Sequence, residues 1–314
     1  MAYSKNIRLY LVIILVAGWA ITLTLRQAFL EKKLYRQTRI LMGTFFEVIS
    51  PDERAGEIVF KEVARLEQLL SKYKEDSEIS KLNRSGRITA SADTFYIIQR
   101  AKENTLKTNG AFDITVAPLM DLWGFSERNF SVPSALKIKE NLRLVGADKI
   151  ILHERNNVIE FKLSGMKIDL GGIAKGYALD RAVEKLKASH IKSCLIDAGG
   201  QVYALGKRSG RKWKVSIRSP RNGKNANIIE LTDQSAATSG GYEQFFLKDG
   251  QSYCHIIDPK TGYPVKSGIV SVTIIEDSGL NSDALSTAIF VLGENGINML
   301  KSKFSKAKFY IIKD

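Results

Sequence analysis

Two oxygen-bearing side chains lie one helical turn apart near the end of the sequence. Asp283 and Thr287 stand four residues apart in the run Ser-Asp-Ala-Leu-Ser-Thr, so a helix presents both on one face. A carboxylate beside a hydroxyl suits a hard cation such as Mg²⁺, which often takes waters and substrate phosphates as its other ligands. The alternative is structural: Asp283 complements the helix N-terminus and Thr287 packs. The pattern alone favours this alternative.

One of the three histidines stands where it can do chemistry. His255 ends an apolar strand pattern and directly precedes the tight turn Asp258-Pro-Lys-Thr-Gly262, whereas His153 and His190 lie among surface-like residues. Histidine is the side chain best suited to take a proton near neutral pH. A lone histidine in such a place is more often a structural group, so both interpretations stay open.

A glycine-rich turn supplies a candidate phosphate site. In the run Asp169-Leu-Gly-Gly-Ile-Ala-Lys175, a carboxylate is followed by glycines and then by a predicted helix. Free N–H groups at a helix start favour phosphate, and glycine lets a ligand approach closely. The spacing matches neither GxGxxG nor GxxxxGK[ST], and an ordinary strand-to-helix turn is the alternative.

Two further segments offer contacts for a flat aromatic ligand. The first is the loop Gly110–Pro118, in which Asp113 lies between apolar residues. The second combines Met42 and Tyr73, which come from neighbouring predicted elements. A buried loop capped by Asp113, and core packing by Met42 and Tyr73, are the alternatives.

The elements that position these residues follow from hydrophobic periodicity. Helices are expected at 57–73, 93–109, 134–145, 174–189, 282–292 and 295–303. Strands are expected at 40–49, 149–153, 157–162, 166–170, 192–197 and 307–313, and short strands alternate with turns over 201–275. The sequence therefore predicts an α+β fold with central, largely antiparallel sheets flanked by helices.

Charge and cysteine content narrow the class of protein. The 314 residues carry a net charge of +14, and residues 1–36 contribute six basic side chains against one acidic one. The remaining charge is spread along the chain, which fits a basic surface facing anionic lipid, attraction of polyphosphate substrates, or a mixture of both. No nucleic-acid motif accompanies it, which argues against nucleic-acid binding. Cys194 and Cys254 lie in apolar runs, so buried free thiols are favoured over a disulfide.

The N-terminal segment has the composition of a membrane anchor. Residues 9–25 are apolar and uncharged, at the short limit of a transmembrane helix. No small-x-small cleavage site follows, so an uncleaved anchor is favoured over a cleaved signal peptide. The expected organisation is an anchor or signal segment over 1–36, with one N-terminal transmembrane helix, followed by a globular domain over 37–314.

Taken together and in this order, the motifs resemble the ApbE family of FAD:protein FMN transferases over about residues 38–312. Gln201 departs from the pattern, because family members commonly place Asn or Asp after the preceding Gly-Gly. The matching pieces are Met42-Gly-Thr, Leu70-Ser-Lys-Tyr73, Ser77–Asn83, Gly110–Pro118, Asp169–Gly176, Asp197-Ala-Gly-Gly200, Thr238-Ser-Gly240, His255–Gly262 and Asp283–Thr287.

The resemblance implies a role for each candidate residue. His255 would be the catalytic residue. Mg²⁺ would be bound by Asp283 and Thr287, with the carbonyl of Gly172 as a further ligand and Ser286 nearby. FAD would be held by Met42, Tyr73, Ala111, Phe112, Asp113, Asp169, Lys175 and the stretch around Ile257.

The implied activity is Mg²⁺-dependent transfer of FMN from FAD to a Ser or Thr hydroxyl of a target protein, with release of AMP. The implied acceptors are membrane-associated redox proteins, such as subunits of sodium-pumping or Rnf-type complexes. The implied location is the cytoplasmic (inner) membrane, with a single-pass anchor and the catalytic domain on the outer, periplasmic side. An FAD pyrophosphatase that yields FMN and AMP is one alternative. A non-catalytic flavin-binding protein is another, although a carrier needs neither His255 as a base nor a metal at Asp283 and Thr287.

Overall fold

The computed structural model describes residues 33–218 and 225–313, together with Trp19. The predicted anchor over 9–25 lies outside the described residues, except for Trp19. Among the residues that are described, no helix combines the length and the apolar character needed to cross a membrane.

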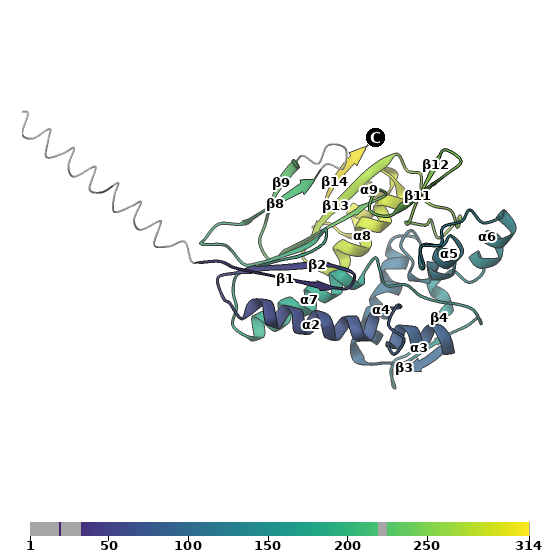
Figure 1. Ribbon diagram of the computed structural model, residues 1–314, viewed down its shortest axis with the longest axis horizontal. Helices are drawn as coiled ribbons and strands as arrows, with labels where there is room; N and C mark the ends of the chain where they lie inside the picture. Colours follow the sequence, from purple (N-terminus) through teal and green to yellow (C-terminus); the bar gives the residue numbers. More distant parts are fainter. Residues whose placement is uncertain (1–18, 20–32, 219–224, 314) are drawn as a thin grey trace, which may run out of the picture.

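A seven-stranded antiparallel sheet forms the centre of the molecule, which confirms the α+β prediction (Figure 1). Consecutive strands of the chain often pair, but β2 neighbours β6 and β7 neighbours β10, so distant segments meet in the sheet. In spatial order the strands are β1 (Tyr35–Leu41), β2 (Thr44–Ser50), β6 (Cys194–Ala198), β7 (Gln201–Leu205), β10 (Gln234–Gly240), β13 (Ile269–Glu276) and β14 (Lys308–Lys313).

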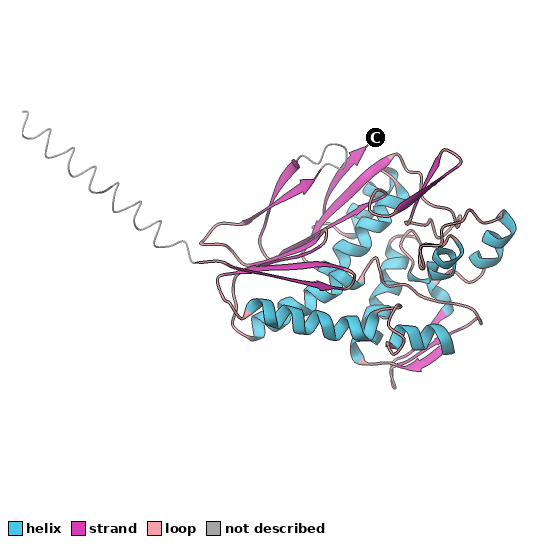
Figure 2. Cartoon of the chain, in the orientation of Figure 1, coloured by secondary structure: helices cyan, strands magenta, loops and turns pink. Residues whose placement is uncertain are grey.

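The two faces of this sheet are covered by different elements (Figure 2). On one face α2 (Ala55–Leu70), α7 (Ala174–Ala188) and α8 (Gly279–Leu292) pack against the strands and one another. On the other face lies the hairpin of β8 (Trp213–Arg218) and β9 (Asn225–Leu231). Side chains alternate accordingly along β2, because Phe46 and Val48 belong to the main core and Ile49 packs in the second cluster.

The remaining helices and short strands lie around the main sheet. A small sheet in the order β3-β5-β4 and the hairpin β11–β12 lie outside the main sheet. These elements are α3 (Glu78–Ser85), β3 (Arg87–Thr89), α4 (Ala92–Lys107), α5 (Ala117–Leu122), α6 (Ala135–Leu142), β4 (Ile150–His153), β5 (Val158–Phe161), β11 (Phe245–Lys248), β12 (Gln251–Cys254) and α9 (Asn295–Lys303), with short 3-10 turns at Ile114–Val116 and Ala147–Lys149.

Two expected strands were wrong. The single strand over 40–49 is a hairpin, because Met42 and Gly43 both take positive φ (49° and 73°) and form a two-residue turn. Residues 166–170 form no strand, since their backbone bonds to a side chain: the amide of Asn83 pairs with both the N–H and the carbonyl of Ile168. The free, buried state of Cys194 and Cys254 is confirmed.

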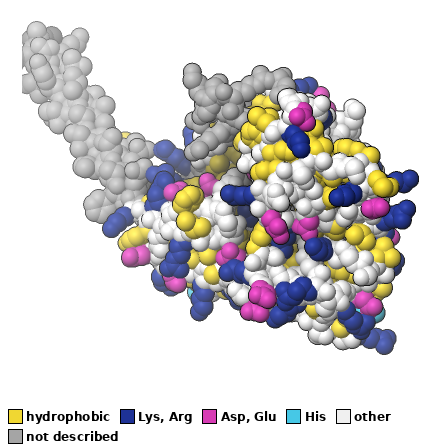
Figure 3. Space-filling view, turned by 45° about the vertical axis from the view of Figure 1, so that its right-hand side comes forward, with side chains coloured by type: hydrophobic (Ala, Val, Ile, Leu, Met, Phe, Trp, Pro, Cys, Tyr) yellow, Lys and Arg dark blue, Asp and Glu magenta, His cyan; other side chains and the backbone are white. Residues whose placement is uncertain are grey.

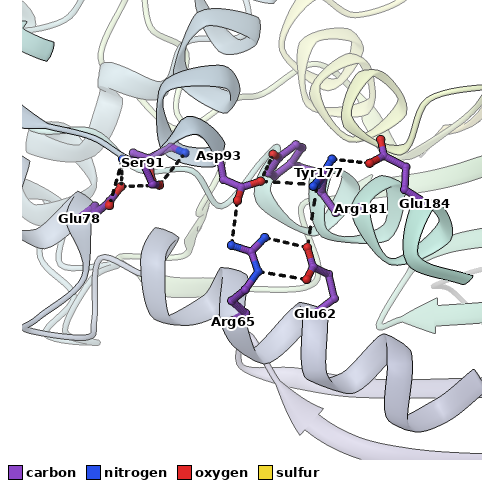
Figure 4. A network of polar contacts seen from close by, with 9 residues as sticks. Glu62, Arg65, Glu78, Ser91, Asp93, Tyr177, Arg181 and Glu184 are labelled. Atoms are coloured by element: carbon purple, nitrogen blue, oxygen red, sulfur yellow. Dashed lines mark hydrogen bonds and ion pairs between the residues drawn. The ribbon is translucent and has the colours of Figure 1, made fainter. Parts of the chain in front are cut away.

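A network of charged side chains connects α2, α4 and α7 (Figure 4). Arg65 of α2 pairs with Asp93 of α4 at 2.8 Å and with Glu62 at 2.7 Å. Tyr177 and Arg181 of α7 approach the same Asp93 carboxylate. Partial burial alone would raise the pKa of Asp93, but the hydrogen bonds from Tyr177 and Arg65 hold it below its usual value.

The first turn of α8 is held from two sides. The Asp180 carboxylate of α7 accepts hydrogen bonds from Ser278 Oγ at 2.9 Å and from the N–H groups of Gly279 and Leu280 at 2.6 and 3.0 Å. From the sheet side, the buried Gln201 amide donates to the Gly279 carbonyl at 3.2 Å. Gln201, the residue that departs from the family pattern, therefore supports α8 from within the core.

We expect Asp180→Ala to lower the free energy of unfolding by about 1–2 kcal/mol, because it removes the acceptor for the orphan N–H groups at the start of α8. Glu184→Ala is the matched control, one turn further along the same helix, where the side chain is 60% exposed and pairs with Arg181. It should change stability by less than about 0.5 kcal/mol. Equal losses in urea denaturation of the two variants would contradict this assignment.

Candidate active site

A cavity of about 250 Å³ opens where the loop after α4, the starts of α7 and α8, and the end of β10 meet. Most of the residues expected from the sequence line it. They are Tyr73, Ala111, Phe112, Asp113, Asp169, Gly172, Lys175, His255, Ile257, Asp283 and Thr287. Two of the expected residues lie elsewhere: Ser286 is buried behind the cavity, and Met42 packs against the main core from the β1–β2 turn.

The close approach of α7 to α8 places Asp283. A Cβ added to Gly176 would lie 2.0 Å from the carbonyl oxygen of Gly279, so the two helices touch through backbone at this point. At this contact the N–H of Gly176 donates to Asp283 Oδ2 at 3.0 Å. The carboxylate is thereby fixed at the start of α7, beside the Gly171-Gly172 turn.

Thr287 and Gly172 lie next to each other across the same contact. A Cβ on Gly172 would be 3.2 Å from Thr287 Oγ1 and 3.3 Å from the Phe112 ring. Ser239 of β10 bonds to Ser286 Oγ at 2.7 Å, and its oxygen is 3.4 Å from Thr287 Oγ1. The Ser286 hydroxyl also donates to the Asp283 carbonyl at 2.8 Å, so Ser286 orders α8 rather than facing the cavity.

The charge at Asp283 is poorly compensated by protein. The residue is 5% exposed, and burial raises the pKa of its carboxyl; Lys175 and the Gly176 N–H offset only part of this rise. No cluster of three His, Cys, Asp or Glu side chains that could hold a metal occurs within the described ranges. One carboxylate with hydroxyl and carbonyl oxygens nearby suits Mg²⁺ completed by substrate phosphates, so these residues fit the expected ion.

The glycine turn carries a second, compensated carboxylate. Asp169 Oδ1 accepts from the N–H of Gly171 at 2.7 Å, and Oδ2 pairs with Lys72 at 2.8 Å. Burial alone would lower the pKa of Lys72, but the Asp169 carboxylate raises it above its usual value, so Lys72 carries its positive charge here. Lys175 reaches back to the Gly171 carbonyl at 3.4 Å, which leaves its ammonium group at the cavity.

His255 enters the cavity from the end of β12 in a defined orientation. Its Nδ1 lies 3.1 Å from the Gln244 carbonyl, which also accepts the His255 backbone N–H at 2.9 Å. Because a carbonyl only accepts, the neutral ring carries its proton on Nδ1 and keeps a lone pair on Nε2. Burial lowers the pKa of His255, so the ring is neutral at pH 7 and able to take a proton.

Asp113 lines the cavity and also caps the loop that carries Ala111 and Phe112. Its Oδ1 accepts from the N–H and hydroxyl of Thr115 at 2.8 and 2.6 Å, and its Oδ2 accepts from the N–H of Ala147 at 3.0 Å. Burial raises its pKa, while these bonds oppose the rise. The loop capped in this way presents Ala111 and Phe112 to the cavity, as the structural alternative for Asp113 anticipated.

Several lining residues were not singled out from the sequence. Thr238 and Ser239 line the cavity, although the sequence assigned them no role. Lys72 does not line it but acts on the site through its ion pair with Asp169. Glu243 and Gln244 sit between β10 and β11 in a segment without periodic pattern, so no sequence signal marked them. Figure 3 shows basic and acidic side chains interspersed over the face in view, in keeping with the charge distribution along the sequence.

The stability of the Asp283→Asn variant, measured with and without Mg²⁺, distinguishes a cation ligand from a structural cap. Without divalent cations, the variant should be at least as stable as the wild type, because it removes a buried and poorly compensated charge. With Mg²⁺ and FAD, the melting temperature of the wild type should rise and that of Asp283→Asn should not. A variant destabilised by more than about 2 kcal/mol in EDTA would instead assign Asp283 to the fold.

The chain is similar to known proteins over most of its length. The ApbE family matches residues 42–311 of the chain. A protein named FAD:protein FMN transferase from Klebsiella pneumoniae is 33% identical over 292 residues, covering 90% of this chain and 91% of that protein. Its namesake from Haemophilus influenzae is 31% identical over 314 residues, covering 94% and 91%.

Solved structures give the same result. The crystal structure of the ApbE protein from Thermotoga maritima superposes with a TM-score of 0.83 at 34% identity, covering 90% of this chain and 94% of that one. The flavin transferase ApbE from Vibrio cholerae superposes with a TM-score of 0.79 at 26% identity over the same shares. The match covers nearly all of the chain after its N-terminal segment, and the chain therefore belongs to the ApbE family.

Proposed function

We propose that this protein transfers FMN from FAD onto a Ser or Thr hydroxyl of an acceptor protein and releases AMP. Relatives with more than 30% identity over most of their length are named FAD:protein FMN transferase. The observation that carries the proposal is the orientation of His255, whose Nε2 has a free lone pair in a cavity shared with Asp283 and Lys175. A base of this kind is what a hydroxyl nucleophile requires and a flavin carrier does not.

The reaction exchanges one phosphoester partner for another. The acceptor oxygen attacks the phosphorus on the riboflavin side of the FAD pyrophosphate, and the bond from that phosphorus to the bridging oxygen breaks. AMP leaves with the bridging oxygen, and FMN stays attached to the acceptor oxygen. His255 Nε2 accepts the hydroxyl proton as the new bond forms.

The other cavity residues position and neutralise the phosphates. Catalysis of phosphoryl-type transfer depends mainly on positioning and on charge neutralisation, and Lys175 supplies a cation at the glycine turn. The proposed ligands of Mg²⁺ are Asp283, Thr287 and the Gly172 carbonyl, and the ion supplies Lewis-acid neutralisation of phosphate charge when bound. The proposed flavin contacts are Tyr73, Ala111, Phe112 and Ile257, which line the cavity.

Intact mass spectrometry of acceptors tests this function. The purified protein is incubated with FAD, Mg²⁺ and membrane redox proteins of its own cell, and the products are analysed for an added FMN group. The proposal requires one AMP released for each FMN attached. Equal release of free FMN and AMP, without any modified protein, would show an FAD pyrophosphatase instead.

We also propose that the protein is anchored in the cytoplasmic membrane by residues 9–25, with the catalytic domain on the outer side. The uncharged apolar run and the absence of a cleavage site in the sequence support this. The acceptors would then be subunits of membrane redox complexes of the sodium-pumping or Rnf type. Retention in the membrane pellet after a carbonate wash fits an anchor, whereas a mature N-terminus near residue 27 means a cleaved signal.

Replacing His255 separates a base from a structural histidine. In His255→Ala, FAD affinity should stay within a few-fold of wild type, while single-turnover flavin attachment should slow about 10²–10⁴-fold. His153→Ala is the control, since His153 lies on β4 beside Glu160 and outside the cavity. Near-normal transfer by a folded His255→Ala protein would remove this residue from the mechanism.

The pH dependence of kcat/KM is a second test of the role of His255. Because burial lowers its pKa below the usual 6.5, the base stays unprotonated through neutral pH and is lost only on further acidification. In the wild type, kcat/KM should therefore be flat near pH 7 and fall below pH 6.5. That acidic limb should be absent from the residual activity of His255→Ala.

A further inference from the structure

Glu243 lines three separate cavities. It lines the active-site cavity and a second cavity of about 360 Å³ beside Tyr73 and Arg128. It also lines a third cavity of about 670 Å³, which shares Thr238 with the active site. The transferase proposed above must admit two substrates, a dinucleotide and a polypeptide, so the cavities that border the active site are candidates for binding the second one.

The third cavity is a groove on the sheet face opposite α2, α7 and α8, and it is called the outer-face groove here. Its floor takes every second residue of neighbouring strands: Glu47 and Ile49 of β2, Leu195 and Asp197 of β6, and Ala236 and Thr238 of β10. Residues two apart in a strand share one face, so the floor is the pleated surface of the sheet.

The wall of the outer-face groove is the edge of a strand. Four consecutive residues of β8, from Lys214 to Ile217, line it. Ile229 of β9, the cross-strand partner of Val215, lines it as well. Because consecutive residues point to opposite faces, the continuous run shows that the groove follows the backbone edge of β8 in addition to side chains that face the sheet. Across residues 33–218 and 225–313, β8 pairs with β9 alone, which leaves its other edge without a strand partner. Such an edge offers a row of N–H and C=O groups to an extended chain.

The charges of the groove favour a polypeptide over the dinucleotide. Both basic side chains that line it are paired: Arg36 with Glu47 at 2.7 Å, and Lys214 with Glu230 at 3.9 Å. The cation at the phosphate-binding turn, Lys175, lies in the active-site cavity instead. A pyrophosphate would gain little in the groove, whereas main-chain groups would find complementary partners along β8.

We propose that the acceptor protein binds with an extended segment in the outer-face groove, added as a strand to the free edge of β8. The segment runs toward Thr238 and Glu243, which line both the groove and the active-site cavity, and its hydroxyl residue enters there to reach His255. This rests on the proposed function, because only a transferase has a polypeptide substrate. Recognition through main-chain bonds fixes the path of the segment, and pockets along the sheet floor select its side chains.

The test compares two variants, each with a single tryptophan introduced at one of two paired positions of the β8–β9 hairpin. Ser216 lines the groove, and its cross-strand partner Ile228 is 62% exposed and does not line it. The probe is the acceptor protein identified by its attached FMN. Ser216→Trp should raise the acceptor KM about tenfold or more, the effect of losing a few main-chain hydrogen bonds. Ile228→Trp should keep the wild-type KM, and FAD affinity verifies that both variants are folded.

Hydrogen exchange on the wild type keeps the proposal falsifiable even if Ser216→Trp does not fold. Saturating acceptor should slow amide exchange in β8, and unchanged exchange there would overturn the groove. Equal acceptor KM values for wild type, Ser216→Trp and Ile228→Trp would also overturn it and leave FMN transfer intact. A wild type that modifies no protein would overturn the proposed function, and the groove with it.

Discussion

The site depends on a backbone contact between two helices. Gly176 of α7 and Gly279 of α8 approach so closely that a single added carbon would collide with a carbonyl oxygen. This contact lets the Gly176 N–H reach Asp283, and it brings the Gly172 turn against Thr287. Asp283, Thr287 and Gly172, which come from two distant parts of the chain, therefore lie together as the proposed oxygen ligands. Asp180 and Gln201 keep α8 in that position from the helix side and the sheet side.

The two faces of the antiparallel sheet carry different parts of the proposed site. The helical face holds the buried carboxyl of Asp283, where a low dielectric would strengthen its interaction with the proposed cation. His255 comes from the β11–β12 hairpin at the end of the sheet, and the Gln244 carbonyl fixes its tautomer. The opposite face is left to the β8–β9 hairpin, whose free edge borders the outer-face groove. Thr238, on a strand between these regions, lines both cavities, so the cavity that holds His255 and the outer-face groove are neighbours.

The local part of this site could be predicted from the sequence. The spacing of Asp283 and Thr287 placed both on one helix face, and the glycine turn before α7 was recognised as the start of a helix. The ion pair of Asp169 could not be foreseen, since its partner Lys72 lies 97 positions earlier in the chain. Glu243 and Gln244 lie in an irregular segment, where the sequence carries no periodic signal. For Asp113 and Met42 the sequence left two interpretations open, and only the structure shows that Asp113 caps its loop and that Met42 packs against the core.

The central claim is that the Gly176–Gly279 contact positions the proposed cation ligands, and Gly176→Ala tests it most directly. The added methyl must push α8 away from α7, at a cost of about 1–3 kcal/mol. The variant should therefore melt earlier and lose the Mg²⁺-dependent part of FAD binding, measured by titration with and without EDTA. Mg²⁺-dependent FAD binding equal to that of the wild type would contradict the account, because Asp283 would then be placed without this contact.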